Sequence, residues 1–174
     1  KLNDIEKGQE CIKHASLAVK ISGKINLGIR VLTDFADKLI EVNNYDFALP
    51  LLQEAYNNSI DHIYEELVRL GVDDIVGKLL DIYCGMQMFK EAAVFLDKFI
   101  EIQKGMNIDK KYKILKNYIK LGMLMIINNE SYMVESIVNN MYKYYDNSCG
   151  SSIEDLKDLN RAYNEVNKEK FNRL

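Results

Sequence analysis

The chain has 174 residues, 48% hydrophobic and 28% charged, which is enough for one domain or one run of repeats with its own core. Its formal net charge of −3 argues against nucleic-acid binding through the charge of the chain as a whole. No apolar run approaches the roughly 20 residues of a membrane span. The three cysteines lie far apart and without a C-x-x-C spacing, which indicates neither a disulfide framework nor a zinc site and fits a reducing cytosol.

One proline and nine glycines leave few breaks, so apolar residues at helical spacing predict a succession of long helices. The chain starts without Met inside the first of them, and we expect a fragment that lacks its N-terminus. Pro50 falls in the second turn of a predicted helix, where we expect a kink or a later start. The predicted helices cover residues 4–20, 25–42, 45–70 (one helix or two, ended by Gly71), 72–86, 89–104, 109–127 (capped by Asp109), 131–145, 151–163 (with a Ser151–Glu154 capping box) and 167–173.

Residues 72–104 carry the clearest pattern, two helices joined by a tight turn at 85–88. The second helix opens with Phe89 followed by Ala92 and Ala93, whose small side chains permit close approach of a partner helix. This pattern is typical of a helical hairpin from a stacked repeat, in which each pair buries a face that it cannot bury alone. Other positions predicted to face inward or to be apolar include Gly8, Cys11, Ala15, Val19, Leu27, Val31, Phe35, Leu39, Tyr64, Leu70, Tyr112 and Tyr132.

The turns repeat at a regular interval. Ile5, Tyr45, Phe89 and Tyr132 each open the second helix of a pair, at offsets of 40, 44 and 43 residues. A tetratricopeptide repeat (TPR) is about 34 residues long. The longer period therefore predicts longer helices in a taller, more sheet-like stack of TPR-like antiparallel hairpins.

No motif indicates an enzyme, a cofactor or a metal site: there is no glycine-rich phosphate loop, nucleophile elbow or H-E-x-x-H. His14 and His62 are predicted to be surface or half-buried structural residues. Cys84 follows a packed tyrosine and is predicted to fill the core. Asp73 and Asp74 lie near a helix start, where the helix dipole explains paired acids without catalysis.

The most distinctive charge feature runs from Lys104 to Lys120, where six lysines accompany a single acid, Asp109. Lys113, Lys116 and Lys120 have helical spacing and fall on one face of one helix. A solvated outer face and a surface for an acidic partner are both open interpretations; the second would speed and orient docking. Near the end of the chain, Glu154, Asp155 and Asp158 form a weaker acidic group mixed with lysines.

Five segments together resemble the soluble NSF attachment proteins (SNAPs), and the gamma branch is the nearest. The likeness covers residues 70–171 in sequence and residues 1–69 through the repeat spacing alone. The segments are IVGKLLDIY (75–83), MFKEAAVFLDKFIEI (88–102), YKILKNYI (112–119), NESYMVES (129–136) and CGSSIEDLKDLNRAYNE (149–165).

The resemblance implies an all-α fold, a right-handed solenoid of TPR-like hairpins (residues 1–146) ending in a small helical bundle that begins at 147–174. It also implies an adaptor in vesicle trafficking that binds SNARE complexes and recruits the NSF-type AAA ATPase for their disassembly. Such a protein is cytoplasmic and lies peripherally on vesicle, Golgi and ER membranes through its partners. The resemblance assigns Lys110, Lys113, Lys116 and Lys120 to the SNARE side and Glu154, Asp155 and Asp158 to the ATPase side.

Two departures from the family limit this expectation. The family's N-terminal membrane-contacting loop is absent, and Leu174 is not taken as the family's ATPase-stimulating leucine, because family members continue past this point. Two other readings remain open: a structural helical-repeat subunit of another assembly, and a peptide-binding repeat domain. A peptide-binding repeat domain would need basic residues on several repeats, whereas the lysines of this chain concentrate on one repeat.

Overall fold

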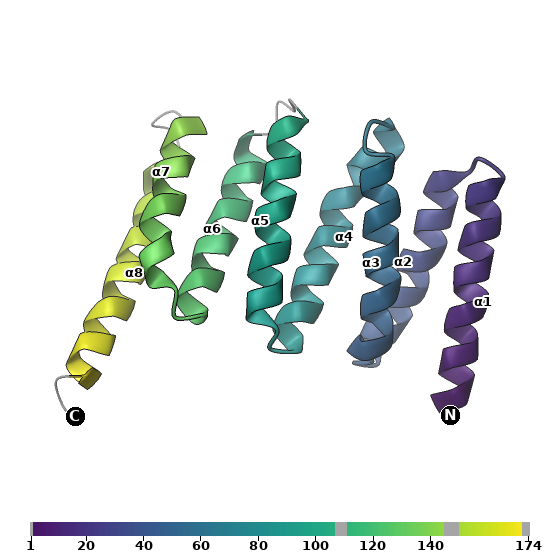
Figure 1. The fold of residues 1–174 in the computed structure, drawn as a ribbon, viewed down its shortest axis with the longest axis horizontal. Coiled ribbons are helices and arrows are strands. Elements are labelled where there is room, and N and C mark those ends of the chain that lie inside the picture. The colour runs from purple at the N-terminus through teal and green to yellow at the C-terminus, as the bar shows by residue number, and fades with distance from the viewer. Residues whose placement is uncertain (1, 107–110, 145–149, 172–174) are drawn as a thin grey trace. The chain divides into compact units, whose positions relative to one another are not determined.

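A computed structural model describes residues 2–106, 111–144 and 150–171. Within these ranges the chain forms eight α-helices and one short 3-10 helix and contains no strand, which confirms the predicted all-α class. The chain divides into two compact units, residues 1–87 and residues 88–174. The predicted hairpin 72–104 spans this division, so its two helices belong to different units (Figure 1).

The first unit consists of α1 (Leu2–Ile21), α2 (Ile25–Glu41), α3 (Tyr45–Asp61) and α4 (Glu66–Gly85). Consecutive helices pack on one another, and α2 and α3 share the largest interface. Its core is built from one face of each amphipathic helix. The fully buried side chains come from α2, α3 and α4 and include Leu32, Ala36, Ala48, Leu51, Leu52, Ala55 and Leu79.

The predicted inner face of α1 is partly wrong. Cys11 and Ala15 are exposed, and Ser16 is buried instead. The reason lies on α2, where a Cβ atom at Gly28 would be 3.1 Å from the Ser16 carbonyl oxygen. The missing side chain lets α1 and α2 approach closely, and the Ser16 hydroxyl donates to the Gly28 carbonyl oxygen at 3.1 Å. Leu27, also predicted to face inward, is 46% exposed.

The predicted helix end at Gly71 does not occur, and of the two alternatives for Pro50, a kink or a later helix start, the structure excludes the later start. Helix α3 starts at Tyr45 and continues through Pro50, which is exposed, so the expectation of a later helix start is wrong. Helix α4 runs through Gly71 without interruption, since the buried residues Val68, Val72 and Ile75 on either side keep helical spacing. The open question about 45–70 is resolved as two helices, separated at residues 62–65.

The second unit consists of α5 (Phe89–Gly105), α6 (Lys111–Ile127), η1 (Ser131–Met133), α7 (Val134–Tyr144) and α8 (Gly150–Phe171). Helix α6 is central, because it packs on α5, α7 and α8. Its contact with α8 is close at Gly122, where a Cβ atom would lie 2.7 Å from the Leu156 Cδ2 atom. Ala92 and Ala93 on α5, predicted to pack closely against a partner helix, are buried, and so is Leu96.

The end of the chain differs from the prediction. Ser151 lies inside α8 rather than at a cap, and α8 continues to Phe171 without the break predicted between residues 163 and 167. Tyr132 was expected to open a helix with an inward side chain, but it lies in η1 and is 75% exposed. The predicted cap Asp109 and the predicted domain boundary at 146–147 fall outside the described residues.

Four connections of three residues each (22–24, 42–44, 86–88 and 128–130) share one backbone conformation. The central residue has a positive φ: 79° at Gly23, 55° at Asn43, 59° at Gln87 and 62° at Asn129. Its N–H donates to the carbonyl oxygen three residues before it, at 2.8–3.1 Å. In the turns at 23, 43 and 129 the next N–H donates to the carbonyl oxygen five residues before it, which completes a Schellman motif. These turns satisfy the carbonyl groups that a helix end leaves open.

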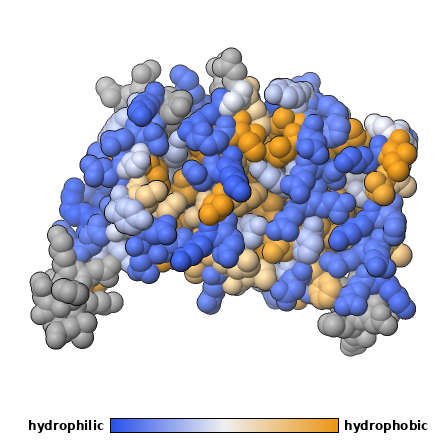
Figure 2. Space-filling view, in the orientation of Figure 1, coloured by the Kyte–Doolittle hydropathy of each residue, from blue (hydrophilic) through white to orange (hydrophobic). Residues whose placement is uncertain are grey.

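Two of the four Asn-Asn pairs, 43–44 and 128–129, lie in these connections at helix ends. The other two, 57–58 and 139–140, lie inside α3 and α7. Asn58 is buried, and its side-chain oxygen accepts a hydrogen bond of 2.6 Å from Lys20. Figure 2 shows the resulting surface, where hydrophilic side chains cover most of the visible face and apolar ones lie between them.

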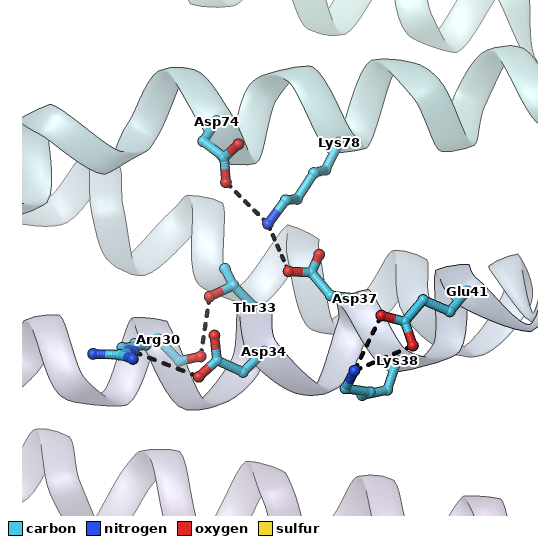
Figure 3. A network of polar contacts seen from close by, with 8 residues as sticks. All are labelled: Arg30, Thr33, Asp34, Asp37, Lys38, Glu41, Asp74 and Lys78. Atoms are coloured by element: carbon cyan, nitrogen blue, oxygen red, sulfur yellow. Dashed lines mark hydrogen bonds and ion pairs between the residues drawn. The ribbon is translucent and has the colours of Figure 1, made fainter.

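One ion pair of Lys78 connects α4 to α2 in the first unit, and a second lies within α4 (Figure 3). The Lys78 ammonium lies 2.8 Å from Asp37 and 2.9 Å from Asp74. Burial opposes the charged form of Lys78, but the hydrogen bonds to Asp37 and Asp74 outweigh it and raise the lysine pKa above its usual range. A pKa raised by folding stabilises the fold below the unfolded-state value, and that stabilisation is lost as pH rises through the folded-state value.

We therefore expect Lys78→Met to cost about 1 kcal/mol or less of unfolding free energy at neutral pH, since the pair is partly solvated. The difference between the two proteins should shrink above about pH 10.5, where the unfolded-state lysine loses its proton. Urea unfolding of both proteins at neutral pH and above about pH 10.5 measures this difference in unfolding free energy. A difference that stays constant to high pH would contradict the role of the Lys78 charge.

Candidate functional site

Three of the four lysines that the resemblance assigns to the SNARE side lie on helix α6. Lys116 is exposed, whereas Lys113 and Lys120 are half-buried. We call these three residues the basic stripe; the fourth predicted residue, Lys110, lies outside the described residues. Leu115, Tyr118 and Leu121 lie on the opposite side of the helix and are buried. The helical spacing of apolar residues therefore directs the lysines outward.

Lys116 and Lys120 differ in their electrostatic surroundings from the lysines that form ion pairs in the structure. Lys38, Lys78, Lys104 and Lys157 each form an ion pair with a carboxylate, at 2.5–3.0 Å. Helix α6 contains no Asp or Glu. Within the part of the chain that the structure describes, Lys116 and Lys120 have no carboxylate at ion-pair distance. Their charges are thus available to an acidic partner.

Lys104 begins the six-lysine run in sequence, but it is not part of this surface. Its ammonium lies 2.5 Å from Glu101 and 5.3 Å from the centre of the Tyr118 ring. Burial of Lys104 opposes its charge, but the hydrogen bonds to Glu101 and Tyr118 prevail and raise its pKa. Lys104 therefore stabilises the α5–α6 pair instead of facing a partner.

The acidic residues of the ATPase-side prediction lie on the exposed surface of α8, and two of the three are already paired. Glu154 lies 2.7 Å from Lys157, and Asp158 lies 3.1 Å from Arg161. The Lys157 hydrogen bond lowers the pKa of Glu154. Asp155 is exposed and has no ion-pair partner among the described residues. The negative charge of this group is therefore partly neutralised on its own helix.

The side chains considered for chemistry are separated on the surface. His14 is exposed, and His62 is half-buried with its Nδ1 atom 3.1 Å from Glu65. Cys84 is exposed, so the prediction that it fills the core is wrong. Among residues 2–106, 111–144 and 150–171, no three His, Cys, Asp or Glu side chains are grouped to hold a metal ion.

A pocket of about 210 Å³ lies beside the Lys78 ion pairs in the first unit. Its wall is formed by Asp37, Ile40, Tyr45, Lys78, Asp81 and Ile82. Asp37 already neutralises the lysine across this pocket. The pocket therefore presents a mostly apolar wall with one further exposed carboxylate, Asp81.

The exposed face of α6 also carries apolar side chains, and Tyr112 among them was a predicted apolar position. Tyr112 is 64%, Met123 46% and Ile127 52% exposed. These three residues lie four residues before, seven after and eleven after Lys116, which are spacings of one helix face.

No protein-family model matches the chain, and no curated protein matches it either. In the described part of the chain, every helix is too short or too polar to cross a bilayer.

Proposed function

We propose that this chain is a non-catalytic adaptor of the SNAP type, which binds assembled SNARE bundles through the basic stripe on α6 and recruits an NSF-type AAA ATPase. The observation that carries the proposal is the acid-free helix α6, with Lys116 and Lys120 outside any described ion pair. SNARE bundles would supply the missing carboxylates. Such charge complementarity orients docking and makes it sensitive to salt.

The fold we propose for this function is a solenoid of TPR-like hairpins. The packing of consecutive helices within each unit supports it, as do the closed turns that recur at 43, 87 and 129. The adaptor would act on vesicle, Golgi and ER membranes, which it would reach through its partners. For the ATPase side, Asp155 is the strongest of the three acids, because Glu154 and Asp158 are paired on α8.

The test is pull-down and titration of a purified, assembled SNARE bundle with the full chain, at low and at physiological salt. The variant carries Lys113→Glu, Lys116→Glu and Lys120→Glu. Three exposed charge pairs at about 0.2–1 kcal/mol each amount to about 0.6–3 kcal/mol, so we expect roughly a 3- to 150-fold weaker affinity and a reduced salt dependence.

The matched control carries Lys90→Glu, Lys98→Glu and Lys143→Glu, the same change of charge at exposed lysines of α5 and α7. This control should bind almost as the parent does. Equal losses in both variants would mean that net charge acts without a defined site. No binding by the folded parent at either salt would favour a scaffold subunit over the adaptor.

A further inference from the structure

The exposed face of α6 changes character along its length. Its first half carries Tyr112 and the basic stripe, and its last two turns carry Met123 and Ile127. The two apolar side chains lie four residues apart, one turn above the other. We call Tyr112, the basic stripe, Met123 and Ile127 together the α6 face. After the exposed Tyr112 ring at its start, the face is basic over the stripe and apolar at its end.

Each half of this face would contribute differently to binding. Charges at a partly solvated surface accelerate encounter and select a partner of opposite sign. Exposed apolar side chains add affinity when they are removed from water, and that contribution depends little on salt. A surface with charged side chains at one end and apolar side chains at the other favours one of the two directions in which an elongated partner can lie along it.

We propose that the α6 face docks one partner α-helix, which places acidic residues against the basic stripe and apolar residues against Met123 and Ile127. This inference rests on the proposed function and names the part of the bundle that would be recognised. From Lys113 to Ile127 the face is about 21 Å long, at about 1.5 Å per residue. The partner helix therefore needs about four turns that change from acidic to apolar.

A lipid surface is the main competing occupant, because lysines and exposed apolar residues also occur on interfacial helices. A helix that lies in a membrane interface places apolar residues along the centre of its buried face and lysines at the borders. On α6, Lys116 is on the same line as Met123 and Ile127, in the centre of the face. If this face lay on a bilayer, the Lys116 side chain would be directed toward the acyl chains. A partner helix made of protein is therefore the better match for the face.

The test uses the full chain and an assembled SNARE bundle as probe, with affinity measured over a range of salt concentrations. One variant carries Met123→Gln and Ile127→Gln, which keep helix-forming side chains and remove the apolar surface. Its control carries Val94→Gln and Val166→Gln, two side chains of similar exposure on α5 and α8. We expect the first variant to bind about tenfold more weakly, with the salt dependence of the parent retained, and the control to bind as the parent.

The outcomes separate this inference from the proposed function. Unchanged affinity in the Met123 and Ile127 variant, together with lost binding in the charge-reversed variant, overturns the inference and leaves the adaptor standing. Absence of bundle binding by the parent overturns both. Binding of the parent to vesicles rich in phosphatidylserine, abolished by the same glutamines, assigns the face to a membrane and also overturns the inference.

Discussion

Phe99→Ala is expected to lower the free energy of unfolding by about 3–5 kcal/mol. Phe99 lies on α5 and is 1% exposed, in the middle of the core of the second unit. Its removal leaves a cavity at a site where Leu96 and Ile100 are also fully buried, so little can move to fill it. Urea unfolding followed by circular dichroism measures the loss.

The matched control for this prediction is Val94→Ala, on the same helix but 56% exposed. Its effect should remain within about 0.5 kcal/mol. A Phe99→Ala protein that unfolds at the urea concentration of the control would show that the α5–α6 core is looser than its burial indicates.

Gly122→Leu is expected to destabilise the second unit by about 2–3 kcal/mol, because added side-chain atoms overpack a close helix contact. A Cβ atom at this position would already lie 2.7 Å and 2.9 Å from the two Cδ atoms of Leu156. Leu156 is buried on α8, so it has little room to withdraw. The measurement is again the urea midpoint, and hydrogen exchange of α8 should increase with it.

Gly71→Leu provides the control, since Gly71 is also inside a helix but a Cβ atom there would have no neighbour within 4 Å. Replacing an exposed helical glycine is expected to be neutral or to stabilise by up to about 1 kcal/mol. In addition, Gly122→Leu combined with Leu156→Ala should recover part of the loss. If both glycine variants behave alike, the α6–α8 contact is not the cause.

Sequence periodicity predicted most helices because their buried faces repeat at helical spacing, as on α4 and α5. It failed where tertiary packing outweighs local propensity. Gly71 predicts a helix end, yet α4 continues because packing on both sides holds it. On α1, the buried residue is Ser16 because Gly28 lies on another helix, and no pattern within α1 contains that information.

The candidate site was predictable in part. The spacing of Lys113, Lys116 and Lys120 correctly placed them on one helix, but only the structure shows that the Lys104 ammonium also lies over the Tyr118 ring of α6. The pairing of Glu154 with Lys157 and of Asp158 with Arg161 was readable in advance, since both pairs are three residues apart on one helix. The exposure of Met123 and Ile127 was not, because apolar residues at helical spacing ordinarily predict burial.

The three-residue turns at 22–24, 42–44, 86–88 and 128–130 restrict where residues can be inserted into or deleted from the chain. Each turn is fixed by backbone hydrogen bonds at both of its ends, so one residue more or less would rotate the following helix away from its neighbour. The connection at residues 62–65 is built differently, since none of its residues has a positive φ. A duplication that starts in one closed turn and ends in the next would preserve every turn it touches. Two helices lie between the turns at 43 and 87 and two between the turns at 87 and 129, so recombination at these turns would add or remove whole helix pairs.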